Sequence, residues 1–150
     1  MDLTRHEQLI ELFHQRARIA GTFGMRLSFD GDGNAAIDLP YNPKLDHGLG
    51  GIHGGVYCTL MDSAGWFTAA ARHEDSVWVA TSEMSVHLLA PVYQTDLHAE
   101  GRIIKAGKRQ DVCEMRLFDA AGRLVAHGTG TFVVLPGVSW NPAAASGGDS

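Results

Sequence analysis

The 150-residue sequence has few cysteines, fewer basic than acidic residues and no long apolar run. Its two cysteines, Cys58 and Cys113, lie far apart in apolar surroundings, which predicts two reduced core thiols and not a disulfide framework. Lys and Arg number 12 against 17 Asp and Glu, and the resulting net charge of -5 argues against a nucleic-acid-binding protein. No apolar run approaches the roughly 20 residues of a membrane span. We therefore expect neither nucleic acid nor a membrane as a partner.

Targeting and metal-binding motifs are scarce as well. The first seven residues are polar and show no apolar signal region, which predicts a cytoplasmic protein. The eight histidines show neither His-x-His nor HExxH spacing, so we expect no metal site. What the sequence does have is 45% apolar residues, enough for one core, and a length typical of one domain. We place this domain at residues 1–136 and expect the segment 137–150, which is rich in small and polar residues, to be disordered.

Periodicity predicts an amphipathic helix at the start of the chain. Apolar residues recur near helical spacing from Leu3 to Ala20. Thr4 followed by Glu7 fits a capping box, and Gly21 is a natural place for the helix to end.

A hairpin and a long loop are predicted next. Two short strands, 24–29 and 34–39, flank the sequence Asp30-Gly31-Asp32-Gly33, and Asp-Gly between alternating runs is typical of a hairpin. The stretch 41–52 is too polar and too rich in glycine for a core element. We interpret it as a loop, and long loops in compact domains are often functional.

The segment from Gly54 to Arg72 is predicted to be a buried helix. Apolar residues recur at helical spacing, and the few polar ones are scattered around the helix without forming a charged face. A helix that is apolar nearly all round is buried, so other elements must surround it.

The second half of the chain supplies strands that can surround this helix. Four segments, 77–89, 96–106, 110–119 and 124–135, show strand character, with alternating polar and apolar residues in the third and fourth. The turns at 107–108 and 120–122 are short, which predicts antiparallel neighbours. The predicted fold is α+β: a hairpin and a four-stranded antiparallel meander form one curved sheet around the central helix.

The sequence before and inside this helix carries the chemistry. A glycine-rich turn, Gly50-Gly51-Ile52-His53-Gly54-Gly55, enters the helix, where free backbone N–H groups and a positive dipole end favour a carbonyl oxygen or an anion. Asp62 is a lone carboxylate in the apolar helix and fits a general base or a nucleophile. The pattern predicts a site where a carbonyl group is polarised and attacked.

This pattern resembles the hotdog-fold acyl-CoA thioesterases, and within them the PaaI-like branch of the phenylacetate pathway. The resemblance covers about residues 24–135 and rests on the Gly-Ile-His-Gly-Gly turn, the following Leu60-Met61-Asp62, Thr81, and the strand that ends Leu88-Leu89-Ala90-Pro91. It implies hydrolysis of an acyl-CoA thioester at a dimer interface. It implies no cofactor, because coenzyme A is part of the substrate.

The resemblance also implies roles for individual residues. Asp62 matches the catalytic acid, and Gly54 matches the glycine whose N–H binds the thioester oxygen. Thr81 falls where relatives carry a hydroxyl that positions water. His47 falls where many relatives carry Asn or Gln, in contact with the thioester or the water. His53 either supports the loop through side-chain hydrogen bonds or contacts the substrate.

Further residues are candidates for substrate binding. Gly55 and Ser82 adjoin the catalytic candidates. Tyr57 and Trp66, with Met61 and Phe67, fit an aromatic or medium-chain acyl pocket, although residues of this kind at helical spacing also build cores. A basic cluster near the 107–108 turn fits either a solvated hairpin tip or a site for CoA phosphates: Lys108 and Arg109, with Lys105 and Arg102 nearby.

The distance between two of these residues predicts a dimer. Gly54 and Asp62 are eight residues apart, which is roughly 12 Å along one helix, whereas a reacting carbonyl must lie about 3 Å from both donor and nucleophile. We therefore predict a two-fold homodimer with antiparallel helices and two equivalent sites, and a pairing of dimers into a tetramer.

Two other functions fit the same fold. One is a non-catalytic acyl-CoA-binding module. The other is a hydratase or dehydratase in which His47 or His53 works with the helix acid.

Overall fold

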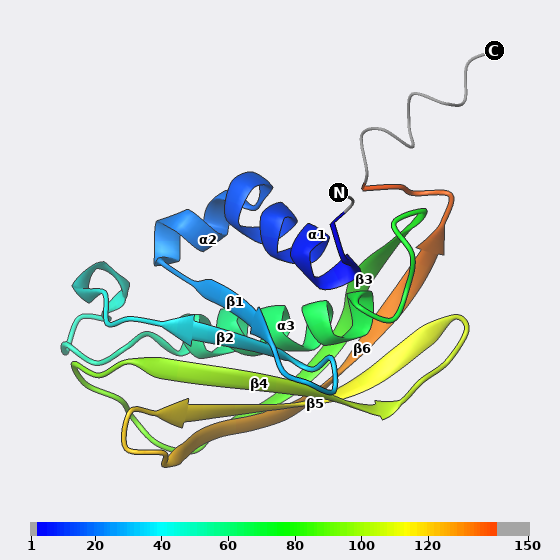
Figure 1. Ribbon diagram of the computed structural model, residues 1–150. Helices are drawn as coiled ribbons and strands as arrows, with labels where there is room; N and C mark the ends of the chain where they lie inside the picture. The colour runs from blue at the N-terminus through cyan, green and yellow to red at the C-terminus, as the bar shows by residue number, and fades with distance from the viewer. Residues whose placement is uncertain (1–2, 141–150) are drawn as a thin grey trace.

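The computed structural model describes residues 3–140 and shows a six-stranded antiparallel sheet curved around one helix, α3 (Gly54–Ala70) (Figure 1). The strand order is β1-β2-β4-β5-β6-β3. The bounds are β1 Arg26–Phe29, β2 Ala35–Leu39, β3 Val77–Leu88, β4 Leu97–Lys105, β5 Gln110–Asp119 and β6 Leu124–Pro136. The predicted α+β architecture, a curved sheet wrapped around a buried helix, is confirmed.

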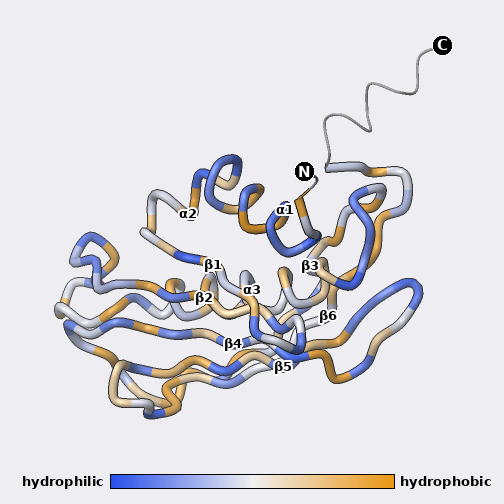
Figure 2. The backbone as a smooth tube through the Cα atoms, in the orientation of Figure 1, coloured by the Kyte–Doolittle hydropathy of each residue, from blue (hydrophilic) through white to orange (hydrophobic). Residues whose placement is uncertain are grey.

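The core lies between α3 and the concave face of the sheet. Leu60, Met61 and Ala64 are fully buried on the helix, and buried residues alternate along the strands β2, β4, β5 and β6 that cover it. Along β5, for example, Cys113 and Met115 face the helix while polar neighbours face away, and the hydropathy of the chain alternates accordingly (Figure 2). Period-two alternation therefore sets which face of the sheet is covered.

One glycine lets the sheet approach α3 closely. A Cβ atom at Gly101 in β4 would lie 2.4 Å from the carbonyl oxygen of Ala64 and 2.5 Å from Oγ1 of Thr68. Any larger residue at position 101 would push the strand and the helix apart, so the close contact depends on glycine.

The predicted meander is wrong at one strand. β4, β5 and β6 are neighbours in sequence order, as their short turns require, but β3 pairs with β6 and not with β4. The connection of eight residues between β3 and β4 contains Pro91 and is too long for a tight hairpin, so it leaves β3 free to lie beyond β6. This places β3 at the edge of the sheet.

The N-terminal segment differs from the single helix predicted for Leu3–Ala20. It consists of α1 (Arg5–Glu11), a π-helical turn η1 (Leu12–Arg16) and α2 (Arg18–Phe23), with the helical backbone broken at Ala17. A local π turn rotates the following residues relative to a regular helix. Here it lies where Phe13 packs edge-on against Phe67 of α3, with ring centroids 5.1 Å apart. Tertiary packing therefore accompanies the break.

The start of this segment follows the prediction, and its end does not. Thr4 Oγ1 accepts from the Glu7 amide at 3.2 Å, and the Thr4 amide donates to Glu7 Oε2 at 2.7 Å, which confirms the capping box. The helix does not stop at Gly21. It continues to Phe23 and is capped by Gly24, whose φ of 86° is the left-handed conformation that glycine adopts readily.

The predicted β1–β2 hairpin is confirmed. Phe29 pairs with Ala35, and Asp30 Oδ1 accepts from the amides of Asp32 and Asn34, each at 2.9 Å. The long loop contains a short 3-10 turn, η2 (Pro43–Leu45), and lies between β2 and α3. The central helix ends at Ala70 and not at the predicted Arg72.

Residues beyond β6 contact the N-terminal helices. The Trp140 carbonyl accepts from Arg16 Nη1 at 2.6 Å, and the Arg5 guanidinium lies 4.8 Å from the centre of a Trp140 ring. We expect disorder for residues 137–150, but most of that segment, 141–150, lies outside the residues that the structure describes.

A buried carboxylate ties the end of α3 to the β4–β5 turn. Asp111 is completely buried and accepts from Arg72, from His73 Nε2 at 2.7 Å and from the Gly107 amide at 3.0 Å. Removing one partner of a buried pair leaves the other charge uncompensated.

We expect Asp111→Asn to lower the free energy of unfolding by about 2–3 kcal/mol. Removing one partner of a fully buried ion pair usually costs about 3–5 kcal/mol, and the cost is smaller here because the Arg72 side chain is partly exposed. Urea denaturation measures this value. Asp32→Asn, in the exposed β1–β2 turn, is the control, and equal stability of the two variants would contradict the structural role of Asp111.

Candidate active site

Asp62 lies in the middle of α3 and its carboxylate is held by the edge strand. Thr81 Oγ1 in β3 donates to Asp62 Oδ1 at 2.7 Å. Among the described residues, Oδ2 of Asp62 has no hydrogen-bond partner. One oxygen of the carboxylate is therefore oriented by the protein, while the other remains able to accept a proton or attack a carbon.

The N-terminus of α3 is capped by His53. Its Nδ1 accepts from the Gly55 amide at 2.8 Å, so in the neutral imidazole the proton is on Nε2. The Gly55 amide is thereby occupied within the protomer. In the part of the chain that the structure describes, the Gly54 N–H has no acceptor, which makes it the free donor at this helix end. Of the two adjacent glycines, only Gly54 presents a free amide.

Gly54 and Asp62 do not meet in one protomer. They lie eight residues apart in the continuous helix α3, which is roughly 12 Å along its axis. The structure brings Asp62 to Thr81 and His53 to Gly55, and it leaves the free amide and the carboxylate at separate places on the helix.

His47 and Ser82 make contacts within the protomer. His47 Nδ1 accepts from the Leu49 amide at 3.1 Å, and a Cβ at Gly51 would lie 2.6 Å from His47 Nε2, so this ring packs within its own loop. Ser82 lies at the register shift in the pairing of β3 with β6, and its Oγ donates to the Thr131 carbonyl at 3.2 Å. Direct contact of either residue with substrate stays a prediction.

The two aromatic candidates on α3 have different surroundings. Tyr57 is buried, and its hydroxyl donates to the Ala90 carbonyl at 3.0 Å, so it braces the segment that follows β3. Trp66 is half-buried; its Nε1 donates to the Val79 carbonyl at 2.6 Å, and its ring lies 5.0 Å from that of Trp78. Only Trp66 of these two lines the pocket beside Asp62.

This pocket has a volume of about 340 Å³ and is mostly apolar. Its α3 side contains Asp62, Ser63, Trp66 and Phe67, and its β3 side contains Trp78. The rest comes from the N-terminal segment: Leu12, Phe13, Arg16, Ala17 and Ile19. Sequence reasoning missed this contribution, because nothing local in an amphipathic segment shows which helix it will cover.

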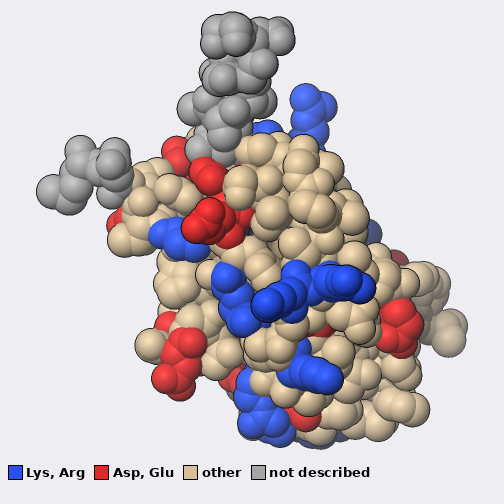
Figure 3. Space-filling view, turned by 90° about the vertical axis from the view of Figure 1, so that its right-hand side faces the viewer, with Lys and Arg blue, Asp and Glu red and all other residues tan. Residues whose placement is uncertain are grey.

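The β4–β5 turn carries the predicted basic cluster. Lys105, Lys108 and Arg109 are exposed and surround a hollow of about 430 Å³. Figure 3 looks onto this side of the molecule and shows Lys and Arg side chains gathered on it. The turn is held by the Asp111 network, so these cations extend from a well-supported hairpin.

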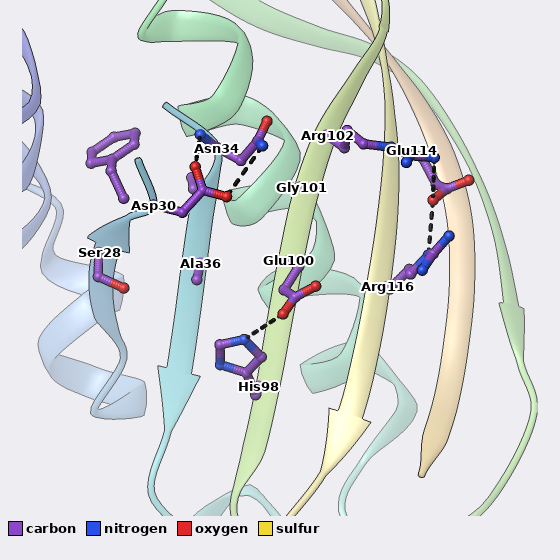
Figure 4. A pocket seen from close by; sticks show the side chains of 12 residues that line it. Ser28, Asp30, Asn34, Ala36, His98, Glu100, Gly101, Arg102, Glu114 and Arg116 are labelled. Atoms are coloured by element: carbon purple, nitrogen blue, oxygen red, sulfur yellow. Dashed lines mark hydrogen bonds and ion pairs between the residues drawn. The ribbon is translucent and has the colours of Figure 1, made fainter. Parts of the chain in front are cut away.

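The convex face of the sheet carries a second polar hollow of about 430 Å³ (Figure 4). His98 bonds Asp38 at 2.6 Å and Glu100 at 3.1 Å, and Glu114 bonds Arg102 and Arg116. Burial lowers the pKa of His98, but the two carboxylates outweigh it and raise the pKa overall. These charges are paired with one another, which is typical of a solvated face. In the described part of the chain, no group of three or more His, Cys, Asp or Glu residues is placed to hold a metal ion.

The two cysteines lie in different environments. Cys113 is fully buried, and desolvation raises the pKa of its thiol to about 12, as expected of a core cysteine. The expectation of a core position is wrong for Cys58, which is only half-buried because it lies on the face of α3 that the sheet leaves open. No disulfide joins them.

The arrangement of a curved sheet around α3, with a glycine-rich helix N-terminus and a mid-helix carboxylate, defines a hotdog-type thioesterase domain. The sequence profile of the thioesterase superfamily matches residues 49–126, from the loop before α3 into β6. The chain belongs to this superfamily and is a hydrolase of the thioesterase class. This confirms the predicted family, whereas the PaaI-like branch stays a prediction.

Individual relatives agree with this assignment. A Saccharolobus solfataricus protein named as a candidate esterase is 33% identical over 103 residues, which cover 68% of this chain and 67% of that protein. The structure of BH2602 from Bacillus halodurans with CoA is 30% identical, covers 85% of each chain and has a TM-score of 0.76. A thioesterase family protein from Silicibacter pomeroyi shares the fold, with a TM-score of 0.82 at 24% identity over 89% of this chain and 100% of that one.

Within residues 3–140 no helix has the length and apolar character that crossing a membrane requires.

The hydroxyl of Thr81 provides a test of the site. We expect Thr81→Val to lower the kcat of thioester hydrolysis by about 10–100-fold, because a hydrogen bond to a charged group is worth about 1.5–3 kcal/mol. Thr81→Ser keeps the hydroxyl and is the matched control, with a rate close to that of the unmodified enzyme. A valine variant as fast as the serine variant would show that this hydrogen bond does not matter.

Proposed function

We propose that the protein hydrolyses an acyl-CoA thioester to a carboxylic acid and CoA, with Asp62 as general base or nucleophile. The observation that supports this most is the Asp62 carboxylate, oriented by Thr81 through one oxygen and free at the other, beside an apolar pocket. The CoA in the Bacillus halodurans structure supports a CoA ester as the substrate class.

Two chemical routes fit this carboxylate. In the first, Asp62 removes a proton from a water molecule that attacks the thioester carbon. In the second, Asp62 itself attacks, forming a mixed anhydride and releasing CoA thiolate, and water then hydrolyses the anhydride. In both routes the carbonyl oxygen becomes negative, and the Gly54 N–H at the positive end of α3 is the proposed donor to it. The departing thiolate takes up a proton from the site or from solvent.

We propose that the donor and the carboxylate belong to different subunits. A distance of roughly 12 Å along one helix separates them within a protomer. A two-fold homodimer with antiparallel α3 helices would place Asp62 opposite the partner's Gly54 and would build two equivalent sites. The open face of α3 suits such an approach, because most of its half-buried residues are small: Cys58, Thr59, Asp62 and Ser63. Pairing of these dimers into a tetramer stays a prediction.

We assign the two ends of the substrate to the two surfaces already described. The acyl group would enter the pocket between the N-terminal segment and α3, where Trp66 and Trp78 offer aromatic surface. The CoA phosphates would lie near Lys108 and Arg109, since cations at a supported turn suit phosphate even in an acidic protein. His53, through Nε2–H, is a second candidate donor to the thioester oxygen. The reaction needs no cofactor in this proposal, and we place it in the cytoplasm.

A thiol-release assay over a panel of aromatic, medium-chain and long-chain acyl-CoA esters tests the proposal. We expect hydrolysis of at least one class. Binding of these esters without turnover would favour the acyl-CoA-binding module. Loss of enoyl absorbance in enoyl-CoA without thiol release would favour a hydratase. Either result would overturn the proposed hydrolysis of acyl-CoA esters.

A further inference from the structure

Two successive residues after β6 connect two walls of the proposed acyl pocket. Ser139 Oγ donates to the Asp75 carbonyl at 2.8 Å, and Asp75 lies three residues before Trp78, which lines the pocket from β3. The Trp140 carbonyl accepts from Arg16 Nη1 at 2.6 Å, and Arg16 lines the pocket from the N-terminal segment. We call these two residues, 139 and 140, the strap, because they join the β3 wall to the N-terminal wall.

The strap is also anchored through its tryptophan ring. The Arg5 guanidinium lies 4.8 Å from the centre of a Trp140 ring, a distance at which a cation is attracted to an indole face. Arg5 Nη2 in turn donates to the Ala70 carbonyl, at the end of α3, at 2.9 Å. The chain after β6 accordingly turns back toward the start of α1, as the orange segment of Figure 1 shows. The strap is therefore held in place by side chains of the N-terminal segment.

The N-terminal wall has few other connections near the strap. The preceding turn is fixed where Phe13 packs against α3. At Ala17 the backbone leaves the helical conformation, with a ψ of 94°. Among residues 3–140, the bond from Arg16 to Trp140 is the one hydrogen bond that joins residues 16–19 to a part of the chain outside the N-terminal segment. The position of this part of the wall therefore depends on the strap.

This part of the wall is also open to solvent. Arg16 is exposed, and the Ile19 side chain is 48% exposed although it lines the pocket. An outward movement of the wall would therefore expose little additional apolar surface and would cost little free energy on that account. A bulky occupant of the pocket would push the wall in this direction, and the strap opposes that movement.

We infer that the strap fixes the width of the acyl pocket, and that Arg16, through its bond to the Trp140 carbonyl, is a positioning residue that excludes bulky acyl groups. The inference rests on the proposed function, because it takes the acyl group as the occupant of the pocket. With the strap attached, the pocket keeps its volume of about 340 Å³ and favours slim acyl chains. With the strap released, the wall yields and bulkier acyl groups enter.

Arg16→Met tests the inference, because methionine keeps an unbranched apolar side chain at the pocket but donates no hydrogen bond. The measured quantity is the ratio of kcat/KM for the bulky adamantaneacetyl-CoA to kcat/KM for the slim octanoyl-CoA. We expect this ratio to rise about tenfold, the lower end of the discrimination that a hydrophobic pocket achieves for one methylene group. A role in stability alone would change both rates equally and leave the ratio as it was.

Two variants serve as controls. Arg16→Lys keeps a donor for the carbonyl and should keep most of the original ratio. Arg18→Met removes an exposed arginine that does not line the pocket and should keep the ratio entirely. An unchanged ratio in Arg16→Met, or an equal rise in Arg18→Met, would overturn the inference.

Ser139→Ala releases the other end of the strap and should raise the same ratio. Because the two substitutions interrupt one connection, the double variant with Arg16→Met should exceed the larger single effect by less than about twofold. Single effects that multiply in the double variant would show that the two residues act separately, which would reject the strap.

Binding of free acids separates this inference from the thioesterase proposal. The chain has three tryptophans, and Trp140→Phe leaves Trp66 and Trp78, both at the pocket, as the fluorescent indoles, while phenylalanine keeps a ring for Arg5. In this background we expect Arg16→Met to raise the affinity for adamantaneacetate relative to octanoate about tenfold, as read from the fluorescence change.

The outcomes of the two assays are distinct. A rise in relative affinity without any thiol release would keep the strap and reject the hydrolysis of acyl-CoA esters. Thiol release with unchanged ratios in both assays would keep the function and reject the strap. A fluorescence that responds to neither acid would show that this pocket takes no acyl group, and would also reject the strap.

Discussion

Replacing Asp62 with asparagine is expected to lower kcat for acyl-CoA hydrolysis by about 10²–10⁴-fold, the usual contribution of a positioned acid or base. An amide is neither a base nor an effective nucleophile. Its carbonyl can still accept from Thr81 Oγ1, so the local structure is preserved. Thiol release under saturating substrate measures the change, with KM expected to vary much less.

Asp32→Asn is the control for this substitution, because Asp32 is an exposed carboxylate in the β1–β2 turn. It should keep the rate and the melting temperature of the unmodified protein. If Asp62→Asn keeps the same rate as this control, Asp62 has no part in the chemistry.

The second large effect concerns the free amide at the start of α3. Gly54 is the first residue of the helix, a position where proline is well tolerated, and His53 before it has an extended ψ of 136°, which suits a residue before proline. Gly54→Pro should therefore remove the N–H with little change in the helix. We expect kcat to fall by about 10²–10³-fold, as it does when one oxyanion donor is lost.

Gly54→Ala is the matched control, because alanine keeps the N–H. Its Cβ would only displace the flexible end of Leu88, from which it would lie 3.0 Å. A small fall in rate is expected. Equal losses for the alanine and proline variants would show that space at this position, and not the N–H, is what matters.

The two inactive variants can also be combined. Each mixed dimer of Asp62→Asn and Gly54→Pro subunits would contain one site with both groups intact, if each site takes Asp62 from one subunit and Gly54 from the other. Random exchange should then recover about a quarter of the unmodified activity, since half of the dimers are mixed and half of their sites are intact. Sites built within single subunits would recover none.

The local elements of this fold follow from the sequence because their causes are local. The Thr4–Glu7 capping box, the Asp30 turn and the alternation of β5 each depend on residues a few positions apart. The length and apolar character of α3 predict its burial for the same reason. The break at Ala17 and the position of β3 were not predictable in this way. The break follows the turn where Phe13 packs against Phe67 of α3, and β3 pairs with the distant strand β6.

The same distinction between local and distant causes applies to the residues of the candidate site. The glycine turn, His53 and Asp62 all lie within residues 50–62, so their types and spacing show a carbonyl-polarising helix end and a carboxylate. The hydrogen bond from Thr81 to Asp62 spans 19 residues and exists only because β3 lies at the sheet edge next to α3. The apolar pocket beside Asp62 likewise needs the N-terminal segment to fold over the helix.

By itself, then, the sequence determined the class of fold, the helix at its centre and the chemistry at the start and the middle of that helix, since hydrophobic period, glycine and capping act over a few residues. The tertiary structure alone decided which hydroxyl orients the carboxylate, which segment closes the pocket and which strand lies at the sheet edge beside the helix. These depend on contacts between segments far apart in the chain, and no local pattern encodes which distant partner each segment will meet.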